Sequence, residues 1–279
     1  MFDPRLNERD IVAVAADHHT HKPELDREAL RDVMRLSLWA GQMLLQYGAD
    51  TNRVEQTIHR LGTGLGADWM DILVTPDAIV ATTINNYEFR TKVRRAPSRG
   101  VDMTVIAEIS ELSYQVQDGK IDRFGVGEKL MAIDERPHYN RWTVVLAVGL
   151  ACAAFNRLFG GDIATFAVTF FASSGAMFAR QWLHSVELNT VLNWVITAFV
   201  AGIVASLAEL LSLSPLSSTA LAASVLLLVP GVPLINGSED FLNGHITNGL
   251  ARSVWGAILS LAIAMGLSLA ITTMGVSGL

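Results

Sequence analysis

The period of the hydrophobic residues changes twice along the first 140 residues. Apolar side chains recur every three or four positions up to residue 65, alternate with polar ones from Trp69 to Val93, and then return to helical spacing. Gly48 is placed to end the first helix and Asp50 to cap the second. The predicted elements are two helices, three strands and two helices, at residues 24–47, 50–65, 69–75, 78–84, 87–94, 105–117 and 122–135.

Long apolar runs replace this pattern after residue 141. Five of them approach the ~20 residues that a helix needs to cross the hydrocarbon core of a bilayer. They lie near residues 142–160, 163–183, 190–211, 218–235 and 250–273. The expected fold class is a membrane protein, in which a cytoplasmic α+β N-terminal domain is followed by an all-α bundle of five transmembrane helices.

The charged residues are divided just as unevenly. The chain has 279 residues, 51% of them hydrophobic, with 21 Lys and Arg against 27 Asp and Glu. Residues 1–141 hold 18 of the basic and 22 of the acidic residues, whereas residues 142–279 hold only 3 basic and 5 acidic residues. We therefore expect a poorly ordered tail at residues 1–24, a cytoplasmic α+β domain at residues 25–141 and a transmembrane domain at residues 142–279.

Composition and motifs argue against several classes of function. The net charge of −6 is spread without a basic stripe, so no nucleic-acid partner is expected. The single cysteine, Cys152, offers no intrachain disulfide, and the histidines near residue 20 lack the spacing of a metal site. The soluble part has no glycine-rich phosphate loop, HExxH or GxSxG motif. We expect no enzymatic activity, no catalytic residues, no metal and no cofactor.

Basic residues beside the apolar runs indicate an orientation in the membrane. The N-terminus carries no secretory signal, so the soluble domain is expected in the cytoplasm. With that domain inside, only Arg157 falls on an outer flank or loop. The positive-inside rule then predicts a multi-pass protein of the bacterial inner membrane with a cytoplasmic N-terminus and a periplasmic C-terminus. The basic residues on the inner side are Lys129, Arg136, Arg141, Arg180 and Arg252.

Residues 228–252 carry the strongest candidate chemistry. Proline and glycine interrupt the fourth apolar run, and because proline has no N–H, we expect carbonyls of residues 226–229 to lack helical donors. Broken backbone at membrane depth must be buried in protein or line a cavity, and transporters use such breaks to bind ions or substrates. A polar cytoplasmic loop after a kinked helix is the simpler alternative. The candidate pathway residues are Pro230, Gly231, Pro233, Asn236, Glu239, Asp240, His245, Arg252 and Arg180.

Several stretches together resemble the threonine/serine exporter (ThrE-like) family, specifically the shorter YjjP-like chains of its split, two-chain form. They include LLQYGADTNRVEQTIHRLG, PDAIVATTI, RGVDMTVIAEI, RWTVVLAVGLACAAF and TFFASSGAM. The longest is AASVLLLVPGVPLINGSEDFLNGHITNGLARS, which contains the interrupted run. The resemblance covers nearly everything after residue 28.

The resemblance implies a subunit of an inner-membrane exporter of small carboxylate metabolites, of the succinate-type dicarboxylate class. It also implies a small YjjB-like membrane partner in an oligomeric complex, because full-length members carry the equivalent half in one chain. Asp240 or Glu239 would supply a titratable carboxylate, and Arg252 or Arg180 would pair with the substrate's anionic group. The alternatives are a threonine/serine exporter subunit, or a regulatory or enzymatic domain anchored in the lipid bilayer.

Overall fold

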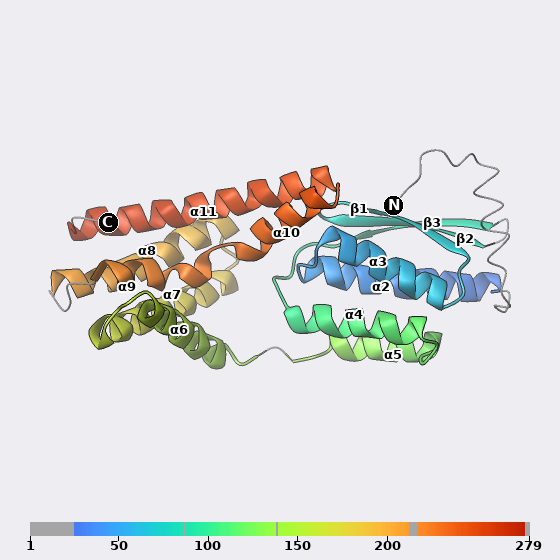
Figure 1. Cartoon of the computed structure of the whole chain (residues 1–279), viewed down its shortest axis with the longest axis horizontal. Helices are drawn as coiled ribbons and strands as arrows, with labels where there is room; N and C mark the ends of the chain where they lie inside the picture. The colour runs from blue at the N-terminus through green and yellow to red at the C-terminus, as the bar shows by residue number, and fades with distance from the viewer. Residues whose placement is uncertain (1–24, 86–87, 138, 212–216, 277–279) are drawn as a thin grey trace. The chain divides into compact units, whose positions relative to one another are not determined.

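The computed structural model describes residues 25–85, 88–137, 139–211 and 217–276 (Figure 1). The predicted tail at residues 1–24 lies outside the described residues. The chain forms two compact units, each assembled from separate stretches of sequence. The described part of the first comprises residues 25–136 and 236–250, and the second contains residues 137–235 together with those from 251 onward. Residues 236–250, which the sequence places within the transmembrane domain, thus group with the N-terminal unit.

The first unit has the predicted order of two helices, three strands and two helices. Gly48, with a φ of 90°, follows the first helix, and Asp50 caps the second by accepting a hydrogen bond from the Arg53 amide at 2.8 Å. Both local predictions are therefore confirmed. The elements are α2 (Arg27–Gln46), α3 (Thr51–Gly64), β1 (Trp69–Val74), β2 (Ala78–Asn85), β3 (Glu88–Arg95), α4 (Met103–Gln117) and α5 (Arg123–Asp134).

The three strands form one antiparallel sheet in the order β1-β2-β3. Within this unit, Figure 1 shows the sheet, the α2–α3 pair and the α4–α5 pair as successive layers. Alternation along the strands gives the sheet one face toward the helices and one outward face. The outward face is unusually apolar, since four large hydrophobic side chains on it are more than half exposed: Trp69, Leu73, Phe89 and Val93.

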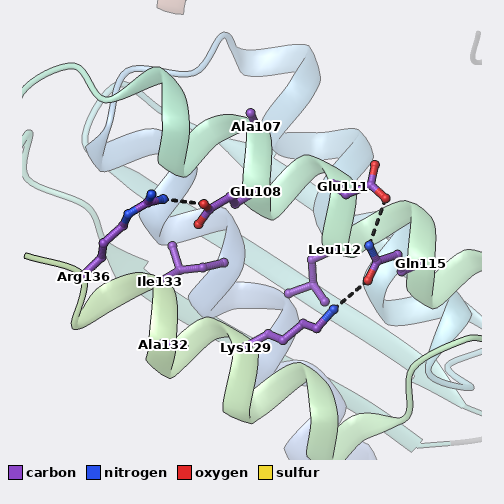
Figure 2. A pocket seen from close by; sticks show the side chains of 9 residues that line it. All are labelled: Ala107, Glu108, Glu111, Leu112, Gln115, Lys129, Ala132, Ile133 and Arg136. Carbon is purple, nitrogen blue, oxygen red and sulfur yellow. Dashed lines mark hydrogen bonds and ion pairs between the residues drawn. The ribbon is translucent and has the colours of Figure 1, made fainter.

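Helices α4 and α5 lie side by side at the outer edge of this unit (Figure 2). An open groove of about 600 Å³ runs between them, with Leu112 and Ile133 among the apolar side chains that line it. Arg136 forms an ion pair with Glu108, and the Lys129 ammonium donates to the Gln115 amide oxygen at 2.7 Å. These polar contacts link the two helices.

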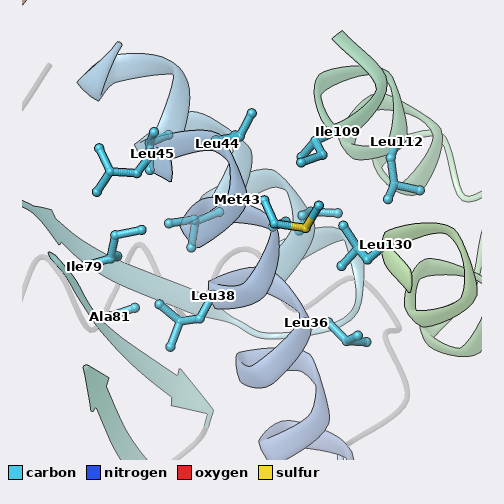
Figure 3. Packing of buried hydrophobic residues seen from close by; sticks show 14 of the residues in the cluster. Leu36, Leu38, Met43, Leu44, Leu45, Ile79, Ala81, Ile109, Leu112 and Leu130 are labelled. Carbon is cyan, nitrogen blue, oxygen red and sulfur yellow. The ribbon is translucent and has the colours of Figure 1, made fainter. Parts of the chain in front are cut away.

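The main hydrophobic core surrounds α2, which is buried on more than one side (Figure 3). Leu38 points toward Ile79 and Ala81 of the sheet, whereas Met43 lies on the side of α4 and α5. Because α2 is the middle layer, its buried set is wider than the single apolar stripe of a surface helix.

Four helices that lie wholly or mostly in the second unit are long and apolar enough to cross a membrane, counted over the described residues. They are α6 (Arg141–Leu158), α7 (Ile163–Ser185), α8 (Thr190–Leu210) and α11 (Ile246–Met274). Small residues allow close contact between them: a Cβ at Gly266 of α11 would lie 2.3 Å from the Val195 carbonyl oxygen of α8. Four of the five predicted spans thus correspond to long apolar helices.

The fourth predicted span, near residues 218–235, is not one continuous helix. It is divided among α9 (Ser217–Ser224), the 3₁₀ turn η1 (Leu226–Leu228) and α10 (Gly231–Leu242), with Pro230 immediately before α10. The interruption falls where the sequence places it, and a fifth crossing of the membrane stays a prediction.

Two of the four carbonyls expected to lack helical donors accept hydrogen bonds from nearer amides instead. The Leu226 carbonyl accepts from the Val229 amide at 3.2 Å, and the Val229 carbonyl accepts from the Gly231 amide at 2.8 Å. Just before the break, the Ser173 hydroxyl of α7 donates to the Ser224 carbonyl at 3.2 Å. Short local turns and a neighbouring helix therefore satisfy backbone groups that a continuous helix would have paired.

Candidate functional site

The candidate site is in the first unit, where the segment 236–250 packs onto the N-terminal end of α3. We call residues 236–250 the docked segment. It contains the end of α10, a turn with Gly244 at a φ of 84°, and the first residues of α11. The His245 amide donates to the Asp240 carbonyl at 2.8 Å and closes this turn. The glycine permits the left-handed backbone that the reversal between the two helices requires.

The two helices of the docked segment approach each other very closely. A Cβ built at Gly249 of α11 would lie 2.8 Å from the Gly237 carbonyl oxygen of α10 and 3.0 Å from the Phe241 ring. Gly237 and Gly249 are both buried. A side chain at position 249 would therefore push the helices apart and disturb the segment.

Asp240 is the most deeply placed acidic residue of the segment. Its side chain is fully buried, and Oδ1 accepts a hydrogen bond from the Thr51 backbone amide at 3.1 Å. Thr51 is the first residue of α3, so the carboxylate lies where helical amides lack partners and where the helix dipole favours negative charge. Asp240 thus supplements the local cap, Asp50, although it lies 189 residues beyond Thr51 in the chain.

Two asparagines complete the attachment of the docked segment. The Asn236 amide donates to the Gly48 carbonyl at 2.7 Å. The Asn248 amide donates to the Thr51 hydroxyl at 3.0 Å and to the Val74 carbonyl at 2.9 Å. The segment is therefore held by directed hydrogen bonds to the loop before α3, to α3 itself and to the end of β1.

Glu55 and His245 form an ionisable pair beside Asp240. Their Oε2 and Nε2 atoms lie 3.7 Å apart, and both side chains are about one-quarter exposed. Burial raises the pKa of Glu55, and the Asp240 carboxylate raises it further, while His245 and a hydrogen bond to the Val74 backbone act in the opposite direction. Two carboxylates and one imidazole thus share a partly desolvated site.

The other predicted pathway residues occupy different surroundings. Glu239 belongs to the first unit and is exposed on α10. Pro230, Gly231, Pro233, Arg180 and Arg252 belong to the second unit. The Arg180 guanidinium lies over the Trp194 ring, 4.4 Å from its centroid. The structure therefore brings together Asn236, Asp240 and His245, but it does not gather all nine residues in one unit.

Sequence reasoning missed the residues that receive the docked segment. The sequence pattern indicates Gly48 only as the end of a helix, and it assigns no role to Thr51, Glu55 or Val74. A glutamate on an amphipathic helix is ordinarily a solvated residue, so the local pattern carried no signal. Among the described residues no group of three or more His, Cys, Asp and Glu side chains could hold a metal ion.

The sequence matches one family model over most of its length. The model, described as "Putative threonine/serine exporter" (ThrE), covers residues 35–274. Those residues include α3, the docked segment and the four long apolar helices. No solved structure matches the chain.

Individual relatives agree with the family match. The "Probable succinate transporter subunit YjjP" of Escherichia coli K12 is 39% identical over 257 residues, which cover 91% of this chain and 99% of that protein. The protein of the same name from Klebsiella aerogenes is 39% identical over 256 residues, which cover 91% of this chain and 99% of that protein. The "Probable threonine/serine exporter" of Mycobacterium tuberculosis H37Rv is 24% identical over 263 residues, which cover 93% of this chain but 49% of the relative.

Proposed function

The chain belongs to the threonine/serine exporter family, and we propose that it works as one subunit of an exporter for small carboxylate metabolites. It is a YjjP-like membrane protein of that family, with four long apolar helices among its described residues. We infer a succinate-type dicarboxylate as the substrate. The support is that relatives named as succinate transporter subunits match at 39% identity over nearly their whole length.

The observation that carries the proposal is the course of the interrupted segment. The chain runs from α9 through η1 and Pro230 into α10, and the buried Asp240 lies in the last turn of α10. An interrupted helix followed by a buried carboxylate is typical of transporters, in which broken helices bind ions and substrates. Such a segment exceeds what a simple membrane anchor requires.

The proposed mechanism is binding and alternating access, in which no covalent bond is broken. Asp240 carries or gates the coupling charge, with Glu239 as the second carboxylate. Arg252 or Arg180 binds the anionic group of the substrate, because a planar guanidinium can form two parallel hydrogen bonds with a carboxylate. Asn236 and His245 complete the polar set at the docked segment.

A second membrane protein is part of the proposal. This chain spans about half of the M. tuberculosis relative but 99% of the E. coli relative, whose name identifies a transporter subunit. We propose that a small YjjB-like chain supplies the remaining half in an oligomeric complex. We also propose the bacterial inner membrane as its location, with residues 25–141 in the cytoplasm and the C-terminus in the periplasm.

Threonine and serine are the second candidate substrates. The description of the family model and the name of the M. tuberculosis relative favour them. An amino acid presents an ammonium beside its carboxylate, so its binding site requires an acidic group as well as a basic one. Both candidates use the same carboxylate-binding step.

Reconstitution tests the proposed function. Proteoliposomes containing this chain, the YjjB-like chain or both are loaded with radiolabelled succinate or threonine, and efflux is followed over time. We expect succinate efflux only when both chains are present. Threonine efflux in its place would select the second candidate, and efflux by this chain alone would overturn the two-subunit proposal. If purified pairs move neither compound, an anchoring role for the helices would replace export.

A further inference from the structure

We propose that Glu55 and His245, beside the buried Asp240, form a proton-binding site that controls docking of residues 236–250 on α3. The inference concerns the first unit alone, since all three residues belong to it. Its consequence for export rests on the proposed function, but its central claim, that docking takes up a proton, does not.

The geometry explains why a proton is needed. Docking places the Glu55 carboxylate beside the fully buried Asp240, whose Oδ1 is already committed to the Thr51 amide. Two like charges in a partly desolvated site repel each other more strongly than in water. A proton on Glu55, or on the His245 imidazole 3.7 Å away, relieves that repulsion. The docked arrangement is therefore compatible with one shared proton and opposed by its loss.

The other charged and polar groups of the first unit near this site have the following contacts and exposure. On α3, Asp50 is paired with Arg53 at 3.1 Å, and His59 stacks edge-on against Trp69 with ring centroids 5.0 Å apart. Glu239 on α10 is exposed, and the α11 portion of the docked segment contains no charged residue. From β1 the site receives only backbone groups of Val74. Glu55, His245 and Asp240 are thus the titratable groups that docking of residues 236–250 brings together.

The sign of the pH dependence follows from the contacts. Burial raises the pKa of Glu55, so the docked state binds this proton more tightly than a state in which the segment is released and Glu55 is solvated. Docking is therefore strongest at low pH and weakens as pH rises through the raised pKa.

The consequence for the chain is a link between proton concentration and the two helices α10 and α11. Both α10 and α11 start or end in the docked segment and continue into the second unit. α10 follows the interrupted run, and α11 is a candidate membrane span. If export works as proposed, an acidic cytoplasm favours the docked segment, whereas an alkaline cytoplasm releases it.

Hydrogen–deuterium exchange of the full chain in detergent tests the proton site without any transport measurement. Peptides covering residues 48–58 and 236–250 are followed between about pH 5 and pH 8, with rates corrected for intrinsic chemical exchange. We expect protection of both segments to fall together as pH rises, by at most about tenfold per pH unit for one proton. Protection that does not change with pH would overturn the proposal, and this measurement needs no substitution.

Three variants locate the proton. Glu55→Gln keeps the size of the side chain without its charge, so both segments should stay protected throughout the pH range. In His245→Gln the protection of both segments should still fall with rising pH, but at a higher pH than in the parent, because the imidazole no longer lowers the Glu55 pKa. Glu128→Gln makes the same charge change at an exposed site on α5 and should behave like the parent. A Glu55→Gln variant that titrates like the parent would refute the assignment.

Discussion

Replacing Asp240 tests how firmly the docked segment is held. In Asp240→Ala the Thr51 amide, at the buried start of α3, loses the acceptor that lies 3.1 Å away. An unsatisfied buried donor costs about 1–3 kcal/mol, and loss of a negative charge at a helix N-terminus adds roughly 0.3–1 kcal/mol. Relief of the repulsion between Asp240 and Glu55 offsets part of this cost. We expect a net loss of roughly 2 kcal/mol, equivalent to an opening of the segment that is about 30-fold more frequent.

The size of the Asp240→Asn effect separates the hydrogen bond from the charge. The asparagine oxygen can still accept from Thr51, so only the charge contribution is lost, at most about 1 kcal/mol and about fivefold in opening. The assay is amide exchange of residues 48–58 and 236–250 at fixed pH. Glu239→Ala, one residue away and exposed, is the control and should change exchange by no more than about twofold. Equal exchange in Asp240→Ala and Glu239→Ala would show that Asp240 does not anchor the segment.

Three further predictions address export, topology and helix packing. Asp240→Asn should abolish efflux from two-chain proteoliposomes while the complex still assembles. Arg252→Lys should slow efflux, because an ammonium cannot form the two parallel hydrogen bonds of a guanidinium. Efflux at the parental rate in both variants would exclude a pathway role for these residues. A reporter that works only in the periplasm should be active when fused after Leu279, and a reporter that works only in the cytoplasm should be inactive there. An active cytoplasmic reporter at this position would show that the topology is the reverse of the one predicted. Gly266→Ala places a Cβ 2.3 Å from the Val195 carbonyl oxygen, and this overpacking should cost about 1–3 kcal/mol of stability and lower the thermal midpoint in detergent. Gly175→Ala, whose Cβ would have nothing within 4 Å, should leave the midpoint unchanged. Equal midpoints for the two variants would contradict this packing.

Local signals in the sequence were sufficient for most of the elements. Gly48 and Asp50 act through backbone conformation and a hydrogen bond three residues away, so their roles could be predicted from neighbouring residues. The interruption at Pro230 was predictable for the same reason, because proline changes its own helix. Its hydrogen bonds were not, since the short turns that satisfy Leu226 and Val229 depend on the path the chain takes after the break.

The docked segment could not be predicted from periodicity. The hydrogen bonds from Thr51 to Asp240 and from Asn248 to Thr51 join residues 189 and 197 positions apart. The hydrophobic pattern of α3 contains no information about the docked segment, and the pattern of the docked segment contains none about α3. The sequence makes Asp240 a candidate because an ionisable residue beside broken backbone at membrane depth indicates function, but its partner on α3 could be found only from the structure. The same applies to Glu55, whose role depends on the residues that cover it.

The two-part construction of the first unit has a consequence for biosynthesis. During translation, residues 25–136 leave the ribosome long before residues 236–250, and α6, α7 and α8 are made in between. Until residue 250 has emerged, the first turn of α3 lacks Asp240, and the carbonyls of Gly48 and Val74 lack their asparagine donors. Domains generally fold as they are synthesised, N-terminal first. Here the N-terminal unit can reach its final state only after the three candidate spans between its two parts have been synthesised, so the last step of its folding must wait for the helices of the second unit.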